Sequence, residues 1–184
     1  GTARLGVGST GALSEIASYR IDVYGHYTDG ERRLGRAGGG KLMSNLRLQP
    51  SSDVQIDLIA DISDQKPERY FGTPTLNGRI VSELRHQNYN ADDSVVRYKD
   101  QRYRLRGQWQ VNDGLTLRNE LYYLRADRHW KNIEGYVYNP QAGTVARSSY
   151  LEITHDLDQR GNRMEAAYDW GANKTVVGWE TSKA

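Results

Sequence analysis

The chain has 184 residues, of which 26% are charged and only 37% are hydrophobic, so it has too few apolar side chains for the core of an ordinary water-soluble domain of this length. Its 13 Tyr and 4 Trp residues argue against disorder, and its net charge of +2 does not indicate a strongly acidic or basic partner. The absence of Cys excludes disulfides and thiolate sites, and the lack of any run of about 18 apolar residues excludes a transmembrane helix.

Apolar and polar residues alternate with a period of two along most of the chain, as they do in β-strands that have one apolar face. The clearest example is the segment 102–111, in which Tyr103, Leu105 and Trp109 alternate with arginine and glutamine. We predict about eight strands, in chain order at residues 2–8, 18–28, 41–48, 54–63, 94–111, 115–125, 148–170 and 175–182.

The connections after the second strand are alternately long and short. Long polar connections are expected at 29–40, 64–93 and 127–147, and short turns at 49–53, 112–114 and 171–174. Short turns at one end of the strands and long loops at the other are typical of bacterial outer-membrane proteins. We therefore predict an all-β, antiparallel, up-and-down transmembrane β-barrel of about eight strands, in which residues 1–184 form a single barrel domain or barrel fragment in the bacterial outer membrane.

Two parts of the pattern are irregular. Residues 9–17 show little alternation and are expected to connect the first two strands. Later, the apolar positions change from odd, as at Leu157, to even, as at Met164 and Tyr168. A β-bulge at Gly161 would account for this change, because a bulge inserts one extra residue and reverses the direction of the side chains that follow.

In such a barrel the two faces of a strand meet different surroundings. The residues expected to face lipid or detergent are Tyr103, Leu105, Trp109, Leu117 and Leu121. Those expected to face the interior are Arg102, Arg104, Arg106, Arg118 and Glu120, with Asp22, Asp57, Asp61 and Glu120 available to neutralise the three arginines of 102–106. The nearly balanced charge of the chain favours this interpretation over a nucleic-acid surface, so no nucleic-acid partner is expected.

Other motifs give no support for catalysis. Residues 35–41 have the spacing of a phosphate-binding loop, but Leu42 stands where a Ser or Thr hydroxyl should ligate magnesium. The four histidines include no pair at metal-ligand spacing, and there is no nucleophile elbow or zinc-protease motif. We expect no enzymatic activity, no bound metal and no cofactor.

The two longest polar segments, 64–93 and 127–147, combine aromatic and cationic side chains. Such a combination suits a planar, anionic or metal-chelating ligand through stacking and charge, although the same side chains could simply pack the loops on one another. The candidate ligand-binding residues are Arg69, Tyr70, Phe71, Arg79, Arg128, Trp130, Lys131, Tyr136 and Tyr138.

Several short motifs, in order, resemble those of TonB-dependent ferric siderophore receptors. They include Tyr-Arg-Ile-Asp at 19–22, Phe-Gly-Thr-Pro at 71–74, Asn-Tyr-Asn at 88–90, Arg-His-Trp-Lys-Asn at 128–132 and Gln-Arg-Gly-Asn-Arg at 159–163. The resemblance implies the first third of the receptor barrel and energy-coupled uptake of a ferric siderophore. It also implies that the partners are outer-membrane lipid, the rest of the barrel, the plug domain and TonB.

The chain departs from that family in what it lacks. The plug, the TonB box and most of the usual 22 strands are missing, so we expect either a piece of a receptor or a shortened barrel that has closed on itself. Two alternatives remain open. One is a small independent outer-membrane barrel with a structural or adhesive role, and the other is a soluble β-rich binding domain.

Overall fold

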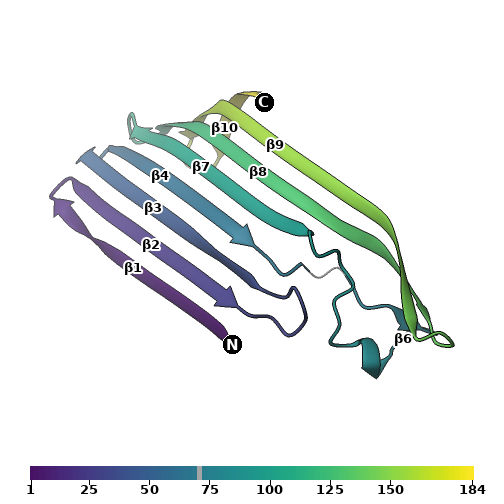
Figure 1. The fold of residues 1–184 in the computed structure, drawn as a ribbon. Coiled ribbons are helices and arrows are strands. Elements are labelled where there is room, and N and C mark those ends of the chain that lie inside the picture. Colours follow the sequence, from purple (N-terminus) through teal and green to yellow (C-terminus); the bar gives the residue numbers. More distant parts are fainter. Residues whose placement is uncertain (70–71) are drawn as a thin grey trace.

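A computed structural model describes residues 1–69 and 72–184 of the chain as one curved sheet with a small appended hairpin (Figure 1). The eight strands of the sheet are β1 (Thr2–Ser14), β2 (Ala17–Thr28), β3 (Ala37–Ser51), β4 (Val54–Lys66), β7 (Val95–Gln110), β8 (Leu115–Asn139), β9 (Thr144–Asp169) and β10 (Lys174–Lys183). The hairpin between β4 and β7 consists of β5 (Thr75–Leu76) and β6 (Arg79–Ile80), and a single 3-10 turn, η1 (Ser82–Leu84), follows it.

The strands of the sheet lie side by side in the order in which they occur in the chain, and every pair is antiparallel. This confirms the prediction of an all-β, up-and-down fold with about eight strands. The sheet is open, however, because β1 and β10 form its two edges and do not pair with each other (Figure 1). None of the helical structure in the described residues is long and apolar enough to cross a membrane.

The first hairpin is longer than predicted. The expected connection at 9–17 is wrong, because β1 continues to Ser14 and only two residues separate it from β2. Thr10 and Ser9 belong to the ladder: the Thr10 hydroxyl donates to the Tyr19 carbonyl at 3.0 Å, and the Ser9 and Tyr19 hydroxyl oxygens are 2.8 Å apart. Small polar residues hide the alternation here, but they can still pair with the neighbouring strand through their backbone groups.

The predicted loop at 127–147 is also wrong. Strands β8 and β9, of 25 and 26 residues, stay paired from Leu115 and Tyr168 to Asn139 and Thr144, and only residues 140–143 form the turn. The Asn139 side-chain oxygen accepts from two backbone N–H groups of that turn, and Gly143 has a φ of +62°. Once the two strands are adjacent, backbone pairing continues whether or not their side chains alternate in polarity.

The β-bulge predicted at Gly161 is absent. Tyr122 pairs with Gly161, and Leu121 and Tyr123 pair with the residues on either side of it without any shift in register. Gly161 instead leaves space for its neighbours: a Cβ there would lie 2.5 Å from the Tyr122 hydroxyl and 2.6 Å from the Thr181 carbonyl oxygen. The change of phase means that the apolar residues of β9 lie on opposite faces of the sheet before and after Gly161. Leu157 is paired with the buried Ala126 on one face, and Met164 and Tyr168 lie on the other.

The predicted segregation of β7 and β8 into two faces is confirmed. On one face, which we call the apolar face, Tyr103 is paired with Tyr123, Leu105 with Leu121 and Trp109 with Leu117. On the other, the polar face, Arg106 is paired with Glu120, and their side chains form an ion pair. The side chains of Leu105, Trp109 and Leu121 are 40%, 51% and 47% exposed, so no part of the described chain covers the apolar face there.

Charges of alternating sign cross the polar face in one transverse row. Successive strand partners in this row, from β3 to β10, are Arg47, Asp57, Arg106, Glu120, Arg163 and Glu180. Ion pairs join the first two at 2.8 Å and the last two at 2.9 Å. Of the four acids expected to neutralise Arg102, Arg104 and Arg106, only Glu120 forms an ion pair with one of them. The other three acids form ion pairs with different cations: Asp22 with Arg20, Asp57 with Arg47 and Asp61 with Lys41.

Candidate functional site

The two regions that were expected to bind a ligand lie at the same end of the sheet. Figure 1 shows the connection that carries β6 beside the far ends of β8 and β9, and β5 contacts β8. The β8–β9 hairpin runs about 16 residues beyond Tyr123, which corresponds to roughly 50 Å of extended strand. The extended hairpin therefore offers the described part of the β4–β7 connection a surface to pack against.

Two buried asparagines fix that connection. The side-chain amides of Asn88 and Asn90 both donate to the carbonyl oxygen of Arg69, at 3.0 and 3.1 Å. The Asn90 side-chain oxygen accepts from the backbone N–H of Ile133 in β8 at 2.9 Å. Asn90 is only 2% exposed, so these bonds replace the water that its amide would otherwise require. The site prediction did not include these two residues, although their Asn-Tyr-Asn motif was part of the family resemblance.

Three of the four candidate cations, Arg69, Arg128 and Lys131, contact other groups of the chain. Arg69 donates from Nη1 to the carbonyl oxygens of Asp92 and Ser94, at 3.2 and 3.0 Å. Arg128 donates from Nη2 to both carboxylate oxygens of Asp100, at 3.0 and 3.2 Å, and its guanidinium carbon lies 5.4 Å from the centre of the Tyr98 ring. These contacts support the interpretation that the side chains pack the loops.

Lys131 is held in a similar way by two residues that were not predicted. Its Nζ lies 2.7 Å from an Asp93 carboxylate oxygen and 5.7 Å from the centre of the Tyr150 ring. The ammonium holds the pKa of Asp93 below its usual range, and the Asp93 carboxylate, with a smaller contribution from Tyr150, raises the pKa of Lys131. The pair therefore links the end of the β4–β7 connection to β8 and β9.

The remaining candidates are more dispersed. Tyr136 donates from its hydroxyl to the Ile133 carbonyl at 2.7 Å, and its ring lies against that of Tyr89, with centroids 6.2 Å apart. Trp130 and Tyr138 are half-buried in β8, and Arg79 is exposed in β6. Tyr70 and Phe71 lie outside the described residues. Whether any of the nine candidates contacts a ligand stays a prediction.

The Asp93–Lys131 pair gives a pH-dependent prediction for this region. Because the pKa of Asp93 is lowered on folding, the pair stabilises the docked connection above the usual aspartate pKa near 4, and its contribution is lost as pH falls through the lower folded value. We expect the hydrogen-exchange protection of the Ser94 amide, which donates to Ala91, to fall on acidification below about pH 4. Lys131→Gln should show the reduced protection already at neutral pH. Equal protection in both proteins across this range would contradict the role of the pair.

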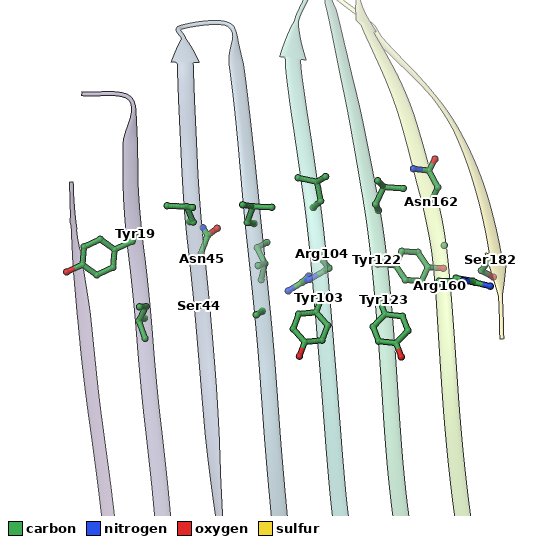
Figure 2. A pocket seen from close by; sticks show the side chains of 18 of the residues that line it. Tyr19, Ser44, Asn45, Tyr103, Arg104, Tyr122, Tyr123, Arg160, Asn162 and Ser182 are labelled. Carbon is green, nitrogen blue, oxygen red and sulfur yellow. The ribbon is translucent and has the colours of Figure 1, made fainter. Parts of the chain in front are cut away.

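A large hollow lies elsewhere, on the apolar face. It is an open groove of about 1160 Å³ that crosses the sheet from β1 to β10. Figure 2 shows Tyr103 and Tyr123 next to each other along it, and their stacked rings have centroids 6.3 Å apart. Among the described residues, no three His, Asp or Glu side chains are grouped so that they could hold a metal ion.

Comparison with known proteins identifies the fold. No protein-family model and no curated protein matches the sequence. Among solved structures, the siderophore receptor PiuA from Acinetobacter baumannii superposes on 97% of the chain with a TM-score of 0.76 and 13% sequence identity. The chain has the fold of a siderophore-receptor segment.

Two further receptors give the same result. The ferric preacinetobactin receptor BauA from Acinetobacter baumannii and the ferric-catecholate import receptor Fiu from E. coli K12 each match 98% of the chain, with TM-scores of 0.72 and 0.74 and identities of 12% and 13%. The chain spans only 27–30% of the length of these three receptors. The sequence resemblance to ferric siderophore receptors is therefore confirmed at the level of the fold, for a limited part of such a protein.

Proposed function

We propose that the chain is part of the barrel wall of a bacterial outer-membrane receptor for ferric siderophores, coupled to TonB in the complete protein. The observation that carries this proposal is the uncovered apolar face on a sheet whose fold matches such receptors. In β4 this face runs through alternate residues from Val54 to Ile62, and a transmembrane β-strand requires about 9–11 residues. The opposite face carries the row of ion pairs, as expected for the inside of a receptor.

The connections favour one orientation in the membrane. Residues 15–16, 52–53, 111–114 and 170–173 form short turns at one end of the sheet, and the β4–β7 connection and the extended β8–β9 hairpin lie at the other. Outer-membrane proteins have their short turns in the periplasm and their long loops outside. The candidate ligand-binding residues would then lie outside the cell, where a siderophore arrives.

The two alternatives explain fewer of these features. A small independent barrel would need its edge strands to pair, but β1 and β10 are separate edges of an open sheet. A soluble domain would have to expose side chains such as Trp109, Val177 and Trp179, which are 51%, 67% and 61% exposed. Soluble monomers rarely leave a contiguous apolar surface of this kind uncovered.

We expect the isolated chain to bind a ferric siderophore weakly or not at all, because Arg69, Arg128 and Lys131 are already engaged by other groups of the chain and the chain supplies only part of an enclosing site. Titration of the chain in detergent with a ferric tris-catecholate complex, followed by Trp130 fluorescence, should give a Kd weaker than about 1 μM. Trp130→Phe is the control, because it leaves the tryptophans at 109, 170 and 179 in place. Tighter binding would contradict an incomplete site, and a saturable change that persists in Trp130→Phe would contradict a contribution from this hairpin.

A further inference from the structure

The groove on the apolar face has a row of leucines along its floor. Leu46, Leu58, Leu105 and Leu121 are successive partners across β3, β4, β7 and β8, and all four line the groove. Leu58, Leu105 and Leu121 are each between 40% and 47% exposed. A continuous strip of leucine side chains, three of them exposed, is suited to contact with hydrocarbon chains.

The next row of the same face changes from apolar to cationic. Tyr103 and Tyr123 are followed, on β9 and β10, by Arg160 and Lys183, which are each other's strand partners. Figure 2 shows Arg160 beyond Tyr123 at the end of the groove near β10. Arg125 lies one row further on, opposite Asp158. This boundary cluster of three cations and one acid therefore borders the leucine row.

The charges of the boundary cluster are not balanced within the described part of the chain. The Asp158 carboxylate accepts a hydrogen bond from the Tyr123 hydroxyl at 2.6 Å. Arg125, Arg160 and Lys183 are exposed and take part in none of the ion pairs there. Arg163, on the opposite face of β9, by contrast forms an ion pair with Glu180. The cluster has a net positive charge that an anion could neutralise.

We infer that the boundary cluster and the leucine row together bind a phosphate-bearing anionic lipid of the leaflet on the long-loop side, with its phosphate at Arg160 and Lys183 and its acyl chains along the groove. This inference rests on the proposed membrane location. A phosphate accepts charge-assisted hydrogen bonds from arginine and lysine, and cations at a membrane surface attract anionic headgroups. The stems of both side chains can lie along apolar surface while their charged ends reach the headgroup level.

The arrangement predicts a preference for anionic lipid that is local to one end of the groove. Trp179 lies on the same face of β10 as Lys183, four residues away, and is 61% exposed. A lipid held at Lys183 would extend its chains past Trp179. Trp109 lies on the same face but on β7, in a row with no cation, so it should meet the bulk lipid.

The test uses the full chain in vesicles, in variants that keep only Trp179 or only Trp109. The vesicles contain phosphatidylglycerol and phosphatidylcholine, and only one of the two lipids is brominated in each sample. The quenching of the tryptophan then measures how much of that lipid contacts it. We expect phosphatidylglycerol to be preferred at Trp179 and not at Trp109. Arg160→Gln and Lys183→Gln should each reduce the preference about fivefold, whereas Arg36→Gln with Arg85→Gln, two exposed cations outside the groove, should leave it unchanged.

The other results separate this inference from the proposal on which it rests. Equal quenching of Trp179 by the two lipids would overturn the inference and leave the membrane location intact. No quenching by either lipid would overturn both. Loss of the preference on addition of inorganic phosphate, but not of chloride at the same ionic strength, would show that the cluster takes the free anion and would contradict a lipid site.

Discussion

Replacing Leu121 by Arg is expected to lower the free energy of unfolding in phosphatidylcholine vesicles by about 2 to 4 kcal/mol. Leu121 lies in the middle of the apolar face, between Asn119 and Tyr123 along β8 and opposite Leu105 on β7. It is 47% exposed, so an arginine there would enter whatever covers this face. If that is hydrocarbon, the guanidinium loses its hydration without gaining a partner.

The measurement is urea unfolding of the two proteins in vesicles, followed by tryptophan fluorescence. Val137→Arg is the matched control, because it makes a comparable apolar-to-cation change on the same strand, beyond the apolar band, at a side chain that is 67% exposed. That variant should change stability by no more than about 0.5 kcal/mol, as surface substitutions usually do. Similar effects of the two substitutions would show that the apolar face does not lie in lipid.

The sequence predicts the faces of β7 and β8 correctly because a strand has a period of two. Once Trp109 is placed on one face, Tyr103 and Leu105 must share it, and Arg102, Arg104 and Arg106 must lie on the other. A shift by one residue would place three arginines on the apolar surface. The short turns at 52–53, 111–114 and 170–173 then fix which strands are neighbours, so the order of the sheet follows.

The errors in the prediction occur where pairing does not depend on side-chain polarity. Residues 127–139 are too polar to show a transmembrane pattern, yet they continue β8 because β9 is already beside them and supplies backbone partners. At Gly161 the sequence shows a change in polarity, which a bulge would explain. The structure keeps the register and uses the missing side chain to accommodate Tyr122, a contact between strands that no local pattern contains.

The sequence predicts which two segments come together at this end of the sheet but not the contacts that they make. The two long segments do lie together, because their strands are neighbours in the sheet. The partners of their cations could not be predicted, since Lys131 pairs with Asp93 from a different connection and Arg128 pairs with Asp100 across a strand pair. Composition shows that acidic and basic residues are nearly equal in number, but it does not show which of them form ion pairs.

One carboxylate of the charged row on the polar face, that of Asp57, is buried and accepts hydrogen bonds from three side chains. Asp57 is only 7% exposed. It accepts hydrogen bonds from Arg47 Nε at 2.8 Å and Nη2 at 3.3 Å, from Gln55 Nε2 at 2.8 Å and from Asn45 Nδ2 at 3.3 Å. Asp61, four residues along the same strand, has a single ion pair to Lys41 at 3.2 Å.

Asp57→Ala is therefore expected to lower the free energy of unfolding by about 2 to 3 kcal/mol, because it leaves three side chains without their acceptor. This value allows for the 43% exposure of the Arg47 side chain, which water can partly solvate after the change. Asp61→Ala is the control and should lose less than about 1 kcal/mol, as expected for an isolated, partly exposed ion pair. Asp57→Asn should fall between the two, since its amide keeps one oxygen acceptor. Equal losses in the two alanine variants, measured by urea unfolding in the same vesicles, would mean that the convergence of donors on Asp57 does not determine the stability of this face.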